Sequence, residues 1–422
     1  MGNLSSKRYL IKNSISTFFR VGVSSISTLL ITPFIIKNIG LSLFGYISLT
    51  SFFVSYAGLF DIGISKALVF LLNEDNISEQ NRSKYISTFY YINIIIISII
   101  FSIGAIGIGF SFPILGSSIP PGSEYYLLMT IVSVLILCLS IFNMLQCAIL
   151  EAYFKLEKAN YGIMLKIMIL NLLYLLNMIW YNNLSIYILS SLISVMIATC
   201  YYSIVIRRTI RINFVRICMA DVKRIFKVSF SFAGVGIFSS LNSALPMLAV
   251  TYFTNGLANI AILNVVNRLS MSIVNLGGSL SRPFFALTKK NPDSIRNQWK
   301  KVLLVYSIGG GICILIVILF RNSINNYFFH ESDLLSLLNY MLIIYVVAAV
   351  VYLIGQSVSM YLMGIGKAVT VTKIIACNSF IFLITYFILN QIFDNVLINL
   401  SIANILMALS YTISLIFNSI KR

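Results

Sequence analysis

Residues 43–72 read LFGYISLTSFFVSYAGLFDIGISKALVFLL, an apolar stretch with charged residues well inside its ends. A helix of this length crosses a bilayer, because about 20 residues at about 1.5 Å each span a hydrocarbon core of about 30 Å. On a helical projection the polar residues share one face, with Lys66 at its edge: Ser51, Ser55, Gly58, Asp61 and Ser65. We therefore expect this helix to turn a polar face toward a bundle interior or a water-filled cavity.

The composition indicates a protein with many membrane-spanning helices. Of 422 residues, 59% are hydrophobic and only 10% are charged, and the mean hydropathy is +0.94. A soluble domain of this size would need more charges to cover its surface. The net charge of +18 is explained better by cytoplasmic loops that collect Lys and Arg than by binding to nucleic acid. The expected fold is an all-α polytopic membrane protein.

Twelve apolar runs are long enough to be transmembrane helices. They cover residues 13–36, 44–72, 86–112, 123–150, 161–181, 185–206, 228–252, 259–287, 302–320, 334–362, 368–389 and 396–418. Nearly all Lys and Arg residues of the connections fall in alternate connections, whereas the connections between these hold only Lys37 and Arg321. The positive-inside rule then places both termini in the cytoplasm, as an even number of helices requires.

The segment 207–227, RRTIRINFVRICMADVKRIFK, divides the chain in half. Apolar residues recur in it at helical spacing with basic residues between them, which predicts a basic amphipathic cytoplasmic linker lying flat on the inner membrane surface. A solvated loop with accidental periodicity is the alternative. The expected domains are an N-terminal six-helix bundle (1–206), this linker (207–227) and a C-terminal six-helix bundle (228–422), with a central cavity between the bundles.

Several predicted helices carry cations. Arg268 lies near the middle of its helix, where an unpaired arginine costs about 2.5 kcal/mol or more, so it needs water, a counter-ion such as Asp61 or an anionic ligand. Arg20, Lys66 and Arg282 lie closer to the cytoplasmic end, and either snorkelling or a role in the cavity suits them. For Lys166, a turn or two into its helix, we expect snorkelling.

These charges favour an anionic cargo. A transporter of cationic drugs is expected to line its cavity with carboxylates, but here Asp61 stands against up to four cations. Guanidinium groups pair bidentately with phosphate, which suits a diphosphate. The sequence holds no metal-ligand cluster, P-loop or GxSxG motif, so we expect neither an enzyme nor a bound metal or cofactor. The predicted outer loops are also too short for the catalytic domain of a polysaccharide polymerase.

Several segments resemble Wzx-type O-antigen flippases, in the superfamily that also holds multidrug and toxic-compound exporters. The resemblance rests on TPFIIKNIGLSLFGYISLTSFF (32–53) and GLFDIGISKAL (58–68), and more loosely on LNVVNRLSM (263–271), SRPFFALTKKN (281–291) and YLMGIGKA (361–368). Lipid II flippases of the same superfamily typically have fourteen helices, two more than this chain has room for. The charged membrane positions of such flippases match Arg20, Asp61, Lys66, Arg268 and Arg282.

The resemblance implies two six-helix lobes that alternate access to undecaprenyl-diphosphate carrying a short oligosaccharide. The expected protein flips this lipid in the bacterial inner membrane for O-antigen and lipopolysaccharide biosynthesis, with a polysaccharide polymerase and a chain-length regulator as further partners. Arg268 and Arg20 would hold the diphosphate, whereas Asp61 would balance charge and carry a coupled proton or sodium ion. The alternative is a proton- or sodium-coupled small-molecule exporter of the multidrug type.

Overall fold

A computed structural model of the chain describes most of its residues. The described ranges are 3–41, 43–45, 47–48, 60–61, 63–73, 78–109, 123–210, 215–253, 257–288, 292–328, 335–393 and 395–420. Side chains are described over somewhat fewer residues, and the gaps include most of residues 49–59 and 276–300. The statements below concern these parts of the chain.

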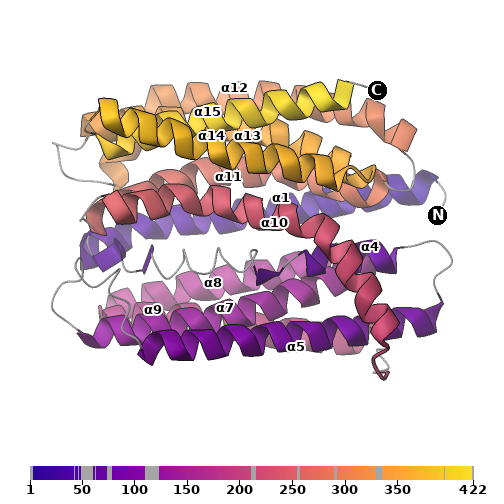
Figure 1. The fold of residues 1–422 in the computed structure, drawn as a ribbon. Helices are drawn as coiled ribbons and strands as arrows, with labels where there is room; N and C mark the ends of the chain where they lie inside the picture. The colour runs from indigo at the N-terminus through magenta and orange to yellow at the C-terminus, as the bar shows by residue number, and fades with distance from the viewer. Residues whose placement is uncertain are drawn as a thin grey trace. The chain divides into compact units, whose positions relative to one another are not determined.

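Helices make up almost all of the described structure (Figure 1). They are α1 (Asn3–Ile39), α4 (Ile64–Leu72), α5 (Glu79–Gly109), α7 (Ser123–Ala152), α8 (Leu156–Trp180), α9 (Leu184–Thr209), α10 (Met219–Phe253), α11 (Leu257–Thr288), α12 (Pro292–Phe328), α13 (Leu335–Gly364), α14 (Ala368–Ile392) and α15 (Val396–Ile420). Each overlaps one of the twelve apolar runs, although α4 covers only the last part of the run 44–72, so the expected all-α fold is confirmed. Ten of the described helices are long and apolar enough to cross a membrane, and the protein is a multi-pass membrane protein.

The chain forms two compact units. Unit 1 consists of Met1–Lys37 and Leu245–Arg422, and unit 2 consists of Asn38–Ala244. The chain therefore passes between the units inside α1 and inside α10, and each of these helices contains a proline near the boundary, Pro33 and Pro246. Contacts thus group α1 with the C-terminal helices and the first part of α10 with the N-terminal ones. The domains 1–206 and 228–422 follow chain order instead and stay a prediction.

Unit 2 is built around α7, which packs against α4, α5 and α9, while α8 packs against α9 (Figure 1). Gly162 of α8 lets the ring of Tyr202 approach from α9, because a Cβ at Gly162 would lie 2.3 Å from that ring. The Tyr202 hydroxyl then donates a hydrogen bond of 3.0 Å to the Ala159 carbonyl. Such pairing of buried polar groups is required where water is excluded.

Unit 1 is built around α13, which packs against α11, α12 and α15, while α14 packs against α15. A Cβ at Gly355 of α13 would lie 2.6 Å from the Thr412 hydroxyl of α15. The absence of that Cβ lets Thr412 donate a hydrogen bond of 2.7 Å to the Val351 carbonyl. Close approach at small residues, with a polar bond across the contact, is a common way for membrane helices to associate.

The connection between the predicted bundles differs from the expected interfacial helix. Residues 207–209 are the last turn of α9, Ile210 is extended, and 215–218 are not helical. The basic residues from Lys223 onward instead belong to the first turns of α10. The amphipathic spacing over 207–227 is therefore divided between two helices, because the backbone must reverse direction between α9 and α10.

Candidate functional site

Asp61 lies at a break in the second apolar run. Residues 61 and 63 form a turn, Gly63 adopts a left-handed conformation with φ 71°, and α4 begins at Ile64. The Asp61 carboxylate accepts hydrogen bonds from the Ser65 hydroxyl (2.6 Å) and the Ser65 backbone N–H (3.2 Å). The carboxylate thus satisfies a backbone donor at the start of a helix, as capping residues do. Asp61 is only 6% exposed.

The turn is packed directly against the backbone of α10. A Cβ at Gly63 would lie 2.6 Å from the Ala233 nitrogen and 2.7 Å from the Ser229 carbonyl oxygen. Only glycine accommodates both this approach and the left-handed backbone. The position of Asp61 in unit 2 is therefore set by α10, a helix far away in the sequence.

The prediction of one continuous helix over 43–72 is wrong at this turn. A residue with φ 71° cannot continue a right-handed helix, whose φ is about −63°. Ser51, Ser55 and Gly58 of the predicted polar face lie outside the described residues. Asp61 and Ser65 do come together, and Lys66 is half-buried in the first turn of α4.

Arg268 of α11 contacts α1 within unit 1. Its Nη1 donates a hydrogen bond of 3.4 Å to the hydroxyl of Thr32, which in turn donates to the Thr28 carbonyl at 2.7 Å. Thr32 is 2% exposed, and the Arg268 side chain is half-buried. One turn earlier on α11, the buried Asn264 Oδ1 has no hydrogen-bond partner among the described residues. Arg268 and Asn264 thus form a polar site between two apolar helices.

The other two predicted arginines of unit 1 lie at a different level. Arg20 precedes Thr32 by twelve residues on α1, about 18 Å along the axis. Arg282 follows Arg268 by fourteen residues on α11, about 21 Å. Because α1 and α11 run in opposite directions (Figure 1), both displacements lead toward the same end of the unit. Arg20 and Arg268 are therefore not side by side, and the Arg282 side chain lies outside the described part.

Lys166 is a further cation within an apolar run, for which we expect snorkelling. It lies ten residues into α8, about 15 Å from the start of the helix, and its side chain is half-buried. This depth is counted from the start of the helix, and the snorkelling of Lys166 toward that end stays a prediction.

Lysine and arginine side chains of unit 2 gather at one end. The start of α5, the turn between α7 and α8 and the connection between α9 and α10 meet there, because Lys158 Nζ donates to the Thr209 hydroxyl (2.9 Å) and the Val215 N–H donates to the Ser87 hydroxyl (3.1 Å). At the turn between α8 and α9, the exposed side chains include Trp180 and Tyr181. Aromatic residues of this kind favour the membrane–water interface.

Comparison with known proteins identifies the fold. No family model and no curated protein matches the sequence, but the structure matches several solved transporters. A MATE transporter of Vibrio cholerae is 12% identical over 99% of this chain and 98% of its own, with a TM-score of 0.74. A MOP superfamily transporter of Pyrococcus furiosus is 13% identical over 99% and 97%, with a TM-score of 0.72.

The chain has the fold of the MATE transporters. A MATE in complex with MaL6 gives the same result, with 13% identity, coverage of 99% and 96%, and a TM-score of 0.74. The MATE fold agrees with the expected all-α architecture of two lobes. The narrower identity as a Wzx-type flippase stays a prediction, because likeness at this level of identity concerns the fold.

Proposed function

We propose that the protein is a flippase that moves undecaprenyl-diphosphate-linked oligosaccharides from the inner to the outer leaflet of a bacterial cytoplasmic membrane. The observation that carries the proposal is Arg268, a half-buried arginine well inside α11 that contacts α1. A permanent cation at this depth suits an anionic headgroup, and a guanidinium matches the oxygens of a phosphate. The excess of membrane cations over Asp61 supports the same sign of cargo.

The positions of the arginines along the helix axes suggest the order in which the cargo would contact them. Arg20 and Arg282 lie about 18–21 Å from the level of the Arg268–Thr32 contact, more than half of a hydrocarbon core of about 30 Å. A diphosphate entering from the expected cytoplasmic end of α1 would first meet Arg20 and Arg282 and then Arg268, while the lipid tail stays in the bilayer. The prolines of α1 and α10 near the unit boundaries would allow bending during alternating access.

Asp61 and Lys66 complete the proposed charge set from unit 2. We propose that Asp61 balances the cations and carries the coupled proton or sodium ion. Its carboxylate is buried and accepts a hydrogen bond from Ser65 in the first turn of α4. Proton uptake there would remove a charge at the turn that packs against α10, so titration and helix packing would be linked.

The fold itself favours a second candidate, a small-molecule exporter. Solved structures of a multidrug resistance MATE family transporter match this chain in the outward-facing and inward-facing conformations, with TM-scores of 0.72 and 0.69. The Pyrococcus furiosus protein also has this fold, and the reversed polarity of its binding pocket suggests a different function for it. By analogy, the basic charge set of this chain supports the flippase.

The proposal requires both termini and the basic end of unit 2 to face the cytoplasm. Cys218 is exposed beside the start of α10, and Tyr181 is exposed at the opposite end. In intact cells, a membrane-impermeant maleimide should label a Tyr181→Cys variant from outside, whereas Cys218 should react only after permeabilisation. Labelling of Cys218 in intact cells would reverse the proposed topology.

Substitution of Arg268 tests the function. Arg268→Ala should abolish surface polysaccharide in a complemented deletion strain, with lipid-linked repeat units trapped on the inner leaflet and normal protein levels. Arg268→Lys should restore part of the activity, because it keeps the charge but loses bidentate geometry. Arg321→Ala near the end of α12 is the matched control and should behave as wild type. Full polysaccharide from Arg268→Ala would refute the proposal, and drug sensitivity of the deletion strain with normal polysaccharide would favour the exporter.

A further inference from the structure

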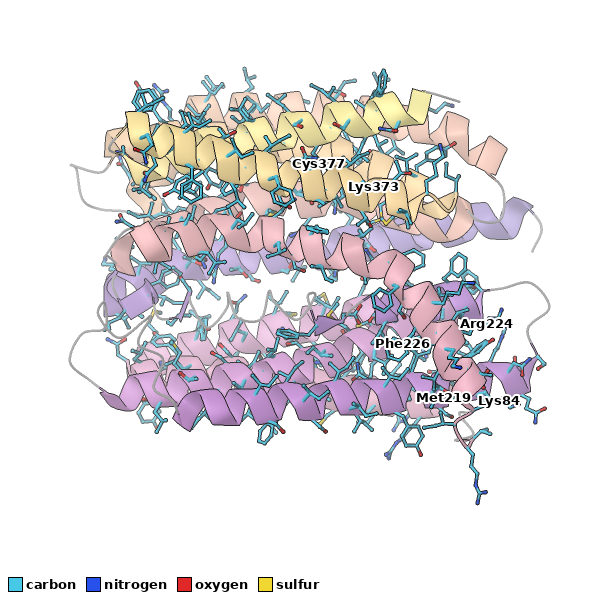
Figure 2. All side chains as sticks on the ribbon, in the orientation of Figure 1. Lys84, Met219, Arg224, Phe226, Lys373 and Cys377 are labelled. Carbon is cyan, nitrogen blue, oxygen red and sulfur yellow. The ribbon has the colours of Figure 1, made fainter. Side chains whose placement is uncertain are left out.

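The beginning of α10 presents an exposed face on which large apolar and basic side chains alternate. Met219, Phe226 and Phe230 recur on one side of the helix, and Met219 and Phe230 are 70% and 72% exposed. We call the following set the amphipathic face: Ile217, Met219, Lys223, Phe226, Lys227 and Phe230. Figure 2 shows Met219 and Phe226 together with Arg224 on these first turns.

The opposite side of the same turns is firmly packed in unit 2. Ile225, Ser229 and Phe232 are buried, and the Phe232 ring lies 5.7 Å from that of Phe70 in α4. The exposed side chains are therefore not part of a loosely packed core. Their apolar surface faces outward because the helix has already used its other side.

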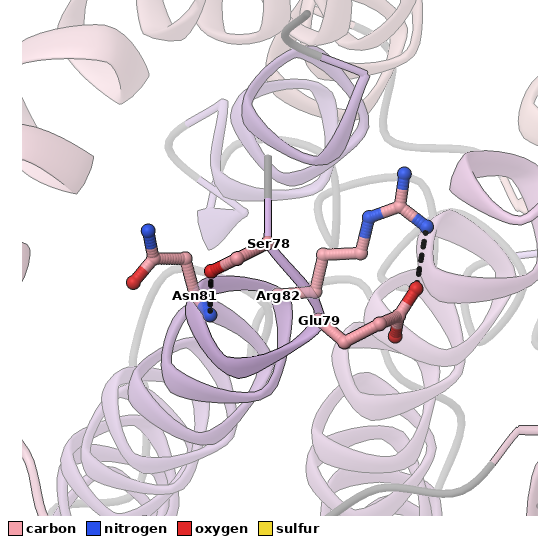
Figure 3. Close-up of polar contacts among 4 residues, drawn as sticks. All are labelled: Ser78, Glu79, Asn81 and Arg82. Atoms are coloured by element: carbon pink, nitrogen blue, oxygen red, sulfur yellow. Dashed lines mark hydrogen bonds and ion pairs between the residues drawn. The ribbon is translucent and has the colours of Figure 1, made fainter. Parts of the chain in front are cut away.

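Contacts with α5 fix the orientation of the amphipathic face. The Arg224 guanidinium lies 5.6 Å from the centre of the Tyr85 ring, and the Val215 N–H bonds to Ser87. The start of α5 is itself anchored, because Ser78 accepts a hydrogen bond from the Asn81 N–H and Glu79 pairs with Arg82 at 3.2 Å (Figure 3). Lys84 is a further cation on the first turns of α5.

The side chains on and around the amphipathic face indicate which kind of partner would bind it. Large exposed apolar side chains beside lysines are typical of helices that lie at the boundary between headgroups and acyl chains. Within residues 215–230, Asp221 is the one acidic residue against four cations of Lys and Arg, so an anionic partner is favoured. The face also lies at the basic end of unit 2, where the membrane helices end.

We propose that the amphipathic face binds anionic phospholipid headgroups through Lys223 and Lys227 and inserts Ile217, Met219, Phe226 and Phe230 among the acyl chains. Because α10 also packs against the turn at Gly63, the leaflet would hold the helix that positions Asp61. The inference requires the membrane placement of the chain but not the identity of the cargo.

Lipid-specific quenching of a tryptophan reporter tests the proposal. Phe230→Trp would be introduced into the full chain after the two native tryptophans are replaced by Trp180→Phe and Trp299→Phe. The protein would be reconstituted into phosphatidylcholine vesicles containing phosphatidylglycerol, with bromine on the acyl chains of one lipid or the other at equal mole fraction. Brominated phosphatidylglycerol should quench about twofold more strongly or better, since each lysine favours anionic lipid.

Two comparisons separate lipid selection from simple burial. Lys223→Gln with Lys227→Gln should abolish the difference between the two lipids, whereas Lys367→Gln with Lys373→Gln, a matched pair at the beginning of α14, should preserve it. In the reporter protein that keeps both lysines, high salt should reduce the difference in quenching between the two lipids. This test needs no substitution of the lysines. Equal quenching by both lipids at low salt would overturn the proposal. Absence of quenching together with cross-linking of position 230 to a second copy would also overturn it, in favour of a protein occupant.

Discussion

Asp61 in unit 2 and Arg268 in unit 1 are both charged residues of apolar segments, but their surroundings differ. The Asp61 carboxylate accepts a hydrogen bond from Ser65, four residues later in the first turn of α4, at a turn packed against α10. Arg268 instead reaches from α11 to the hydroxyl of Thr32 on α1 over 3.4 Å, a long hydrogen bond. The acid is thus held by local capping, whereas the cation lies between helices. A guanidinium that lies between two helices is the better candidate for contact with an anionic ligand.

A substitution at Gly63 tests whether the turn beside Asp61 depends on close packing against α10. Gly63→Ala should cause the largest effect, loss of most folded protein, because its Cβ would overlap backbone atoms of Ala233 and Ser229. Thermal melting of purified protein in detergent measures it. Gly40→Ala shares the left-handed backbone but faces open space, so it should cost only about 1–2 kcal/mol. If Gly63→Ala and Gly40→Ala have the same melting temperature, the close approach to α10 does not contribute to stability.

A substitution at Asp61 separates the structural role of its side chain from the role of its charge in transport. Asparagine caps a helix about as well as aspartate, so Asp61→Asn should leave melting nearly unchanged. If the carboxylate carries the coupling charge, transport of lipid-linked oligosaccharide should still fall about tenfold or more, equivalent to about 1.4 kcal/mol. Ser65→Ala is the control that removes the 2.6 Å hydroxyl bond but keeps the charge. Wild-type transport by Asp61→Asn would leave Asp61 with a capping role alone.

The interhelical contact of Arg268 can be tested most finely at Thr32. Thr32→Val keeps the shape of the side chain but removes the hydroxyl acceptor, so transport should fall about two- to fivefold, equivalent to about 0.5–1 kcal/mol. Initial rates at several substrate concentrations measure this change. Ser24→Ala, whose hydroxyl bonds to the Val21 carbonyl of its own helix, should have no effect. A loss as large as that of Arg268→Ala would mean that Thr32 contacts the cargo itself.

Hydropathy alone predicted the apolar segments in which the helices lie, but not the turn that precedes α4. The runs at 86–112 and 396–418 correspond to α5 and α15 with ends displaced by a few residues, mostly outward. This succeeds because a bilayer requires about 20 consecutive apolar residues whose backbone bonds are satisfied within the helix. The sequence also indicated the charged positions Arg20, Asp61 and Arg268, because ionisable residues are rare in such runs.

Tertiary structure decided how those residues are grouped. The turn at Gly63 exists because the backbone of α10 occupies the space beside it, and periodicity within 43–72 carries no information about α10. Likewise, the separation of Arg20 from Arg268 depends on which residue of α1 lies opposite α11, a register set by packing. The sequence by itself determined which segments enter the membrane, since hydropathy is a property of each segment. Contacts between distant segments determined which charges meet, because only folding brings those segments together.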